Sequence, residues 1–143
     1  MIAGVLSDPT VRMLEQTVNF TEQRHQVLLE DIANVSTPGY VQRDLPVAKF
    51  QATLQDAISR ERQSLNGAYE PSSDQDLSFE PGGSEVDAAS TEQPQAVAFH
   101  DRGIRSMEYL MGQMADNALS HNMAAQLLKT RYDWISRAIS MKP

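Results

Sequence analysis

The side chains in this sequence with the widest chemical range are its three histidines, His25, His100 and His121. Zinc sites combine histidine with cysteine or carboxylate ligands at short, characteristic spacings. No two of these histidines are four residues apart, and the chain contains no cysteine, which excludes thiolate metal sites, disulfides and a cysteine nucleophile. His25 and His121 fall at helical spacing among apolar residues, so half-buried packing positions are favoured over metal ligation.

Two other patterns resemble parts of catalytic or metal-binding motifs. Ser120 directly precedes His121, but adjacent residues of a helix point apart, and no Gly-x-Ser-x-Gly elbow is present. Asp74-Gln75-Asp76 resembles the start of a calcium loop, yet the glycine and the closing glutamate are misplaced. The sequence therefore predicts no catalytic residue, no cofactor and no metal, and the protein is not expected to be an enzyme.

The negative charge of the chain is concentrated in its middle. The net charge is −7, and the stretch between Arg62 and Arg102 holds eight acidic residues but no lysine or arginine. No basic stripe is left to neutralise phosphates, so nucleic acid is not an expected partner. No apolar run approaches the roughly 20 residues of a membrane span. The apolar run at residues 1–6 is too short for a secretory signal, so any export is expected to occur without a cleaved signal peptide.

An unbroken apolar stripe runs through the last forty residues. Its spacings alternate between three and four, which is typical of one helix packing along another. The stripe, called here the C-terminal seam, consists of Ile104, Met107, Met111, Met114, Ala118, His121, Ala125, Leu128, Tyr132, Ile135 and Ile139. A helix over this range would be about 53 Å long at 1.5 Å per residue. Such a helix needs an elongated partner, and Leu110, Ala124 and Leu127 widen the stripe enough to predict more than one neighbour.

A second stripe with the same spacing lies near the start of the chain. It consists of Val11, Leu14, Val18, Thr21, His25, Leu28 and Ile32. Asp8 or Ser7 is suited to cap this helix and Pro9 to its first turn, whereas Thr37-Pro38 should end it near Asn34. The sequence thus predicts an all-α fold in which two long terminal helices form an antiparallel, coiled-coil-like hairpin. A register that sets Asp8 beside Ser140 would pair His25 with His121 as a polar layer.

The region between the two helices is predicted to contain little regular structure. Residues 50–63 form a shorter helix, and residues 64–95 are expected to be extended or disordered, because glycine, proline, serine and acidic residues dominate them. Residues 96–103 are ambiguous and could extend the last helix backwards. The predicted organisation is therefore an N-terminal part (1–63), an acidic flexible segment (64–103) and a C-terminal helix (104–143).

One short motif connects this organisation to a known family. Residues 33–40 read Ala-Asn-Val-Ser-Thr-Pro-Gly-Tyr, which resembles the Ala-Asn-x-x-Thr-Pro-Gly-Tyr signature of bacterial flagellar axial proteins. The following Arg43-Asp44-Leu45 and the helix sequences around residues 114–119 and 127–132 resemble the FlgB family of proximal rod proteins. The chain departs from that family at residues 101–105, before the last helix. The resemblance implies that Asn34, Thr37, Pro38, Gly39 and Tyr40, together with the C-terminal seam, serve assembly.

The resemblance also implies a function. It predicts a structural protein that builds the helical tube of the proximal rod in the flagellar basal body, transmits torque, and leaves the cytoplasm through the flagellar type III export apparatus. Implied partners are copies of itself, rod proteins of the FlgC, FlgF and FlgG type, and the membrane-ring adapter FliE. The alternatives are another rod subunit such as FlgC, or a soluble helical adaptor or chaperone that binds one partner helix in a groove.

Overall fold

The protein is mostly helical. The computed structural model describes residues 8–63, 69–92 and 102–140. Its elements are α2 (Pro9–Asn34), β1 (Arg43–Asp44), α3 (Val47–Gln63), β2 (Leu77–Phe79), β3 (Val86–Ala88), β4 (Thr91–Glu92) and α4 (Arg102–Ser140). The prediction of an all-α fold is wrong in one respect. The strands form two small antiparallel sheets, β1 with β4 and β2 with β3.

The boundaries of α2 follow from local chemistry and agree with the sequence prediction. The Asp8 carboxylate accepts a hydrogen bond from the Thr10 amide at 2.9 Å, and Pro9 occupies the first turn, where its missing N–H leaves no donor unpaired. The helix ends at Asn34, before Pro38. Helix α3 begins at Val47, three residues earlier than predicted, because Pro46 already offers its carbonyl to the Phe50 amide.

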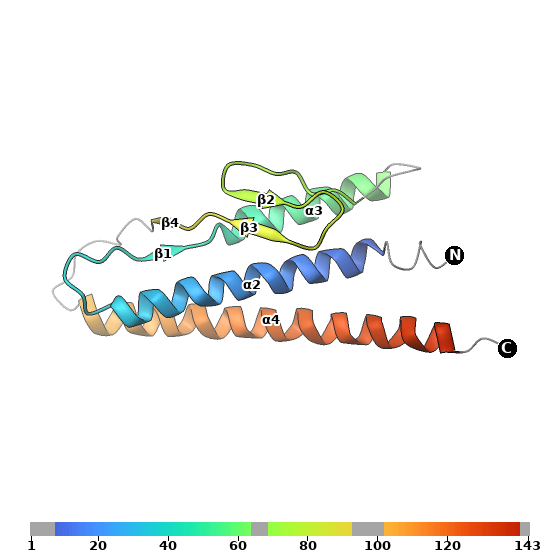
Figure 1. Cartoon of the computed structure of the whole chain (residues 1–143). Coiled ribbons are helices and arrows are strands. Elements are labelled where there is room, and N and C mark those ends of the chain that lie inside the picture. Colours follow the sequence, from blue (N-terminus) through green and yellow to red (C-terminus); the bar gives the residue numbers. More distant parts are fainter. Residues whose placement is uncertain (1–7, 64–68, 93–101, 141–143) are drawn as a thin grey trace.

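Helices α2 and α4 lie side by side and antiparallel, so that the start of α2 and the end of α4 lie at the same end of the molecule (Figure 1). Polar contacts fix the alignment at several levels: Asp8 faces Arg131, Glu15 faces Tyr132, and Arg24 faces Gln113. The positions of the first stripe contact this neighbour well, since Val11, Leu14, Thr21 and Leu28 are buried and the other three positions are half-buried.

The observed register differs from the one predicted. Asp8 lies beside Arg131 and not beside Ser140, and the Nδ1 atom of His121 contacts the Thr21 hydroxyl at 2.9 Å, one turn before His25. The prediction that His121 pairs with His25 is therefore replaced by a His121–Thr21 contact. The sequence argument aligned the two helix ends, whereas α4 is 39 residues long against 26 for α2 and extends past it.

The largest apolar cluster lies on the opposite side of α2 from α4. It joins α2, α3 and the β2–β3 hairpin, and its buried members are Phe20, Leu45, Phe50, Leu54, Ala57, Tyr69, Leu77, Phe79 and Val86. The Phe20 and Phe50 rings stack with centroids 4.0 Å apart, and Phe79 stacks on Phe50 at 6.2 Å. The molecule thus has three layers, with α2 packed between α4 and the α3–hairpin unit (Figure 1).

The predicted disorder of residues 64–95 is wrong for residues 69–92. Tyr69, Leu77, Phe79 and Val86 are each at most 5 % exposed. Leu77 and Phe79 are two residues apart, so in a strand both side chains point to the core. The composition argument considered this segment alone, but its few apolar side chains are buried against aromatic rings of α2 and α3. Residues 64–68 and 93–95 of that prediction lie outside the described residues.

A row of amide side chains on α2 holds the hairpin in place. Gln16 donates to the carbonyl of Gly83 at 3.3 Å, Asn19 donates to the carbonyl of Ser84 at 2.9 Å, and Gln23 donates to the carbonyl of Val86. The Gln23 carbonyl also accepts from the Ala88 amide at 3.2 Å. Gln23 therefore pairs with β3 as a neighbouring strand would, and it satisfies an edge that would otherwise be open.

Candidate assembly site

The motif of residues 33–40 forms a tight turn directly after α2. The Thr37 amide donates to the Asn34 carbonyl at 2.8 Å, and the Tyr40 amide donates to the Thr37 carbonyl at 3.2 Å. Gly39 has a φ of +79°. Proline at the second position and a glycine with positive φ at the third are the pattern of a type II turn. Asn34 also bonds back to the Glu30 carbonyl at 2.8 Å, which closes the end of the helix.

The turn is fastened to α2 through Asp31, which is 1 % exposed. Its Oδ1 accepts from the Tyr40 hydroxyl at 2.8 Å, and the Arg43 amide donates to both carboxylate oxygens at 3.1 and 3.0 Å. Burial raises the pKa of Asp31, although these hydrogen bonds oppose the shift. Burial and the neighbouring Asp31 carboxylate raise the pKa of Tyr40 to about 12. Tyr40 thus remains a neutral donor, and the extended segment leaves the turn in a fixed direction.

Arg24 connects three elements. Its Nε and Nη2 donate to the two Asp44 oxygens, each at 2.8 Å, and Nη2 also donates to Gln113 Oε1 at 2.6 Å. Helix α2 is thereby joined to β1 and to α4. The Arg24 and Asp44 side chains are 12 % and 8 % exposed, and this paired, two-point geometry is the one in which arginine binds a carboxylate most strongly.

Sequence reasoning missed both Asp31 and Arg24 as parts of this site. Arg24 and Asp31 are seven residues apart, so they lie on the same face of α2. Each bonds to a residue that follows the turn: Arg24 to Asp44, and Asp31 to the Arg43 amide. A signal was present: Asp44 was noted within the family-like Arg-Asp-Leu step, and an acidic residue beside the buried Leu45 requires a cation or donors.

A polar layer crosses the contact between α2 and α4. The Thr21 hydroxyl lies 2.8 Å from the Thr17 carbonyl and 2.9 Å from the Val18 carbonyl. Its single hydrogen serves one of these acceptors, so in the contact with His121 the imidazole Nδ1 is the donor. Asn117, which is buried, donates to the Thr21 carbonyl at 2.8 Å. This assignment of hydrogens follows from the network and places the His121 proton on Nδ1.

The C-terminal seam lies entirely on α4, but its residues differ in environment. Met107, Met114, Ala118, His121, Ala125, Leu128 and Ile135 are half-buried. Met111, Tyr132 and Ile139 are exposed, and for Ile104 only its place in the helix is described. The fully buried positions on α4 are Leu110, Asn117 and Ala124, spaced by seven. The contact of α4 with α2 is therefore centred on Leu110, Asn117 and Ala124, next to the C-terminal seam and not on it.

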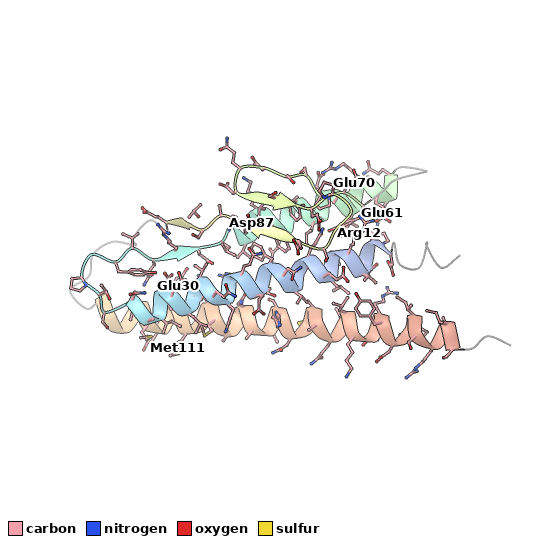
Figure 2. The ribbon with its side chains drawn as sticks, viewed as in Figure 1. Arg12, Glu30, Glu61, Glu70, Asp87 and Met111 are labelled. Atoms are coloured by element: carbon pink, nitrogen blue, oxygen red, sulfur yellow. The ribbon has the colours of Figure 1, made fainter. Side chains whose placement is uncertain are left out.

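A second set of large apolar side chains on α4 remains exposed, although Tyr132 bonds to Glu15 and both Leu127 and Trp134 line a groove beside α2. Its members are large side chains between 44 % and 70 % exposed: Tyr109, Met111, Leu119, Met123, Leu127, Tyr132, Trp134 and Ile139. Figure 2 shows side chains of α4 extending along its outer side, with Met111 labelled near one end. We call this set the outer face of α4. Exposed apolar side chains in this number are typical of a helix surface that packs against another protein.

A polar hollow of about 760 Å³ lies between α2 and the hairpin, lined by residues that include Asn19, Gln23, Glu80 and Asp87. Asn19 and Gln23 already bond to the hairpin backbone there. Within the described ranges no cluster of three or more histidine or acidic side chains is placed to hold a metal, and no helix is long and apolar enough to cross a membrane.

Comparison with known proteins found flagellar rod proteins with similar sequences. The chain is 29 % identical, over 125 residues, to the flagellar basal body rod protein FlgB of Escherichia coli strain K12, which covers 85 % of this chain and 86 % of that protein. FlgB of Shigella flexneri matches with the same identity and coverage, and FlgB of Aquifex aeolicus is 49 % identical over 35 residues, or 24 % of this chain and 28 % of that protein. No family model matches the chain.

The chain is thus similar to FlgB proteins over most of its length. Both of these relatives are named as flagellar basal body rod proteins. The match to the Escherichia coli protein extends over 125 residues, so it exceeds the terminal segments that carry the motif and takes in most of the middle. That middle contains the hairpin packed by Gln16, Asn19 and Gln23.

Proposed function

We propose that this protein is a structural subunit of the proximal rod of the bacterial flagellar basal body. In this proposal the α2–α4 pair forms a coiled-coil-like hairpin that packs against copies and relatives to build a helical tube and to transmit torque. Contacts between different surfaces of identical subunits produce open helical assemblies when the rotation does not close. The FlgB relatives support the rod assignment and do not favour the adaptor or chaperone alternative.

The observation that carries the proposal is the outer face of α4. Leu119, Met123 and Leu127 follow one another at intervals of four, and each is more than half exposed. A helix that is partly buried by α2 and carries such a row of exposed apolar side chains needs a second neighbour, because soluble proteins rarely leave such a row uncovered. Met123 in this row suits a surface that must pack slightly different relatives.

Rigidity of the subunit supports torque transmission. The Arg24 contacts with Asp44 and Gln113 and the amide row join α2 to β1, α4 and β3, and ring stacking of Phe20 on Phe50 joins it to α3. A load applied to α4 would pass to α2 and then to the α3–hairpin unit. We therefore propose that the described residues of the N-terminal part (1–63), of the acidic segment predicted to be flexible (64–103) and of the C-terminal helix (104–143) form one rigid body in the rod.

The proposed partners follow from the same assignment. They are copies of this chain, rod proteins of the FlgC, FlgF and FlgG type and the adapter FliE, which the subunit would meet after passage through the flagellar export apparatus. The proposed location is the periplasmic part of the basal body. No membrane span, nucleic acid or cofactor has a place in this proposal.

Paired substitutions on the outer face test the proposal. Leu119→Asp with Met123→Asp, introduced into a strain lacking the gene, should abolish swimming and leave basal bodies without this subunit. Both positions are exposed, so the purified variant should keep its helix content and its unfolding midpoint. Gln51→Glu with Gln55→Glu adds two charges on exposed positions of α3 and serves as the matched control. Normal swimming by the Leu119/Met123 variant would contradict the role of this face.

A further inference from the structure

The turn of the β2–β3 hairpin carries carboxylates that form no ion pair with the described residues. Residues 69–92 contain seven acidic side chains and no lysine or arginine. None of the ion pairs in the described part of the chain involves Glu80, Glu85 or Asp87. The Glu80 amide bonds to the Glu85 carbonyl at 3.2 Å, so these two residues flank the turn, and Pro81 is exposed within it. We call residues 80–85 the hairpin tip.

A mostly apolar groove of about 410 Å³ lies between α2 and α4 near the start of α2. Its lining consists of Thr10, Met13, Leu14, Leu127, Thr130, Arg131 and Trp134. Trp134 is 70 % exposed and Leu127 is 54 % exposed, so the groove is open to another molecule. Arg137 lies three residues after Trp134, on the same side of α4, and is exposed. The groove therefore combines an apolar floor with positive charge at its edge.

The hairpin tip and the groove lie at nearly the same level along α2. Gln16 donates to the Gly83 carbonyl at 3.3 Å, which places the tip beside residue 16. The groove is lined by Thr10, Met13 and Leu14, which are only about 3–9 Å from residue 16 along the helix axis. Helix α2 lies between the hairpin and α4 (Figure 1), so a molecule cannot place its own tip in its own groove, whereas a neighbouring molecule can.

We propose that copies of this chain pack side by side, with the hairpin tip of one copy in the groove of the next. The contact consists of Glu80, Pro81 and Glu85 from the first copy and of Leu127, Arg131, Trp134 and Arg137 from the second. The proline ring covers the exposed part of the indole, and the two carboxylates lie near the two guanidinium groups. This inference rests on the proposed function and deepens it, because it names the surfaces through which one copy contacts the next.

Charge and position both favour a second copy as the occupant of the groove. Complementary charges on two surfaces select partners and fix their orientation, and here the acidic tip and the basic edge belong to the same chain. The two surfaces are different, so each copy keeps one of them free and further copies can add. Because tip and groove lie at one level of α2, successive copies are placed beside one another with little displacement along the helix axis.

Disulfide trapping in basal bodies tests the contact, because the natural chain has no cysteine. One tagged copy carries Pro81→Cys, a second copy with another tag carries Thr130→Cys in the groove, and both are expressed in a strain that lacks the gene. Mild oxidation of isolated basal bodies should link the two tags. The matched control carries Gln75→Cys in place of Pro81→Cys, at an exposed position before β2. It should link about tenfold less, because a disulfide requires Cβ atoms about 4 Å apart.

Two results would overturn the proposal and leave the rod assignment intact. One is a basal body that contains both tagged copies but no disulfide between positions 81 and 130. The other is linkage that is equal in the control, or that joins position 81 only to a different rod protein. Basal bodies without this subunit would instead contradict the proposed function, and the side-by-side contact with it.

Exchange of the charges gives a second readout that does not require trapping. Glu80→Arg with Glu85→Arg should slow swimming, and so should Arg131→Glu with Arg137→Glu, because each pair places like charges across the contact. All four positions are exposed, so the purified variants should keep their helix content. A chain with all four substitutions should recover at least half of the lost swimming speed. Absence of recovery in a folded, incorporated chain would show that these groups do not meet.

Discussion

Tyr40 donates its hydroxyl hydrogen to Asp31 Oδ1 across 2.8 Å, and this bond joins the residue after the turn to the last turns of the helix before it. The two residues are nine positions apart, with Pro38 and Gly39 between them. The family-like motif therefore has a physical role in the single subunit. It reverses the chain and fixes the direction in which the segment carrying Asp44 and Leu45 returns along α2.

Removal of that hydroxyl should destabilise the subunit. Tyr40→Phe removes one donor from the buried Asp31 carboxylate, and loss of a hydrogen bond to a charged group costs about 1.5–3 kcal/mol of unfolding free energy. The pKa of Asp31 should rise further, because the Tyr40 bond lowers it. Urea unfolding and a chemical-shift titration measure the two effects. Tyr109→Phe on the exposed side of α4 is the control and should change stability by less than about 0.5 kcal/mol.

Two glycines should respond in opposite directions to the same substitution. Gly39 has a φ of +79°, where an L side chain is strained although no atom lies within 4 Å of an added Cβ. Gly39→Ala should therefore cost about 1–2 kcal/mol. Gly112 is exposed within α4 and also has free space, so Gly112→Ala should stabilise by up to about 1 kcal/mol. Equal effects on the unfolding midpoint would mean that backbone conformation does not constrain the turn.

Arg24 should contribute far more to the unfolding free energy than an exposed arginine that also forms an ion pair. Arg24→Met leaves Asp44 without its cation at a nearly buried site, and such a loss costs about 3 kcal/mol or more. Arg60 pairs with Asp56 on the exposed side of α3, and Arg60→Met should cost about 0.5 kcal/mol or less. Chemical denaturation of both variants checks the ratio. Similar losses would indicate that the Arg24 pair does not join the layers.

Alkaline pH should unfold the protein partly through Tyr69. Burial raises the pKa of Tyr69 to about 12, above the ordinary value of 10.0. Between these values the folded state keeps a proton that the unfolded state releases, so stability falls as the pH rises, by at most about 1.4 kcal/mol per pH unit for one tyrosine.

The Tyr69→Phe variant isolates this contribution. It should be less stable at neutral pH by about 1 kcal/mol, because the Tyr69 bond to Gln16 is lost. Its stability should then fall less steeply than that of the natural protein between pH 10 and 12. Thermal unfolding followed by circular dichroism measures both slopes. Parallel slopes would show that Tyr69 does not keep its proton on folding.

Local rules were sufficient for the helices. Asp8 and Pro9 fixed the start of α2, Thr37-Pro38 fixed its end, and the positive φ of Gly39 follows from the Pro-Gly turn. These features depend only on residues that are close together in the chain, so they can be predicted from a single sequence. The all-α assignment failed because Leu77 and Phe79 form only a three-residue strand, which is too short for an alternating pattern to stand out.

The long-range features could not be obtained in the same way. The register of α2 against α4 depends on Thr21, Asn117 and His121 meeting as one layer, and equal heptad spacings on both helices permit several such alignments. Gln16, Asn19 and Gln23 are ordinary surface residues in sequence, and only the position of the hairpin makes them partners of its backbone. Asp31 likewise has no distinctive local context.

The outer face of α4 is the centre of this account, and crosslinking in intact basal bodies tests it most directly. A photoreactive phenylalanine at position 119, in place of Leu119, should link the protein to rod subunits when purified basal bodies are irradiated. The same group at the exposed Gln55 on α3 provides the comparison. The account predicts crosslinks from position 119 to copies of this chain or to other rod proteins. Absence of such links, with position 119 free in assembled basal bodies, would contradict it.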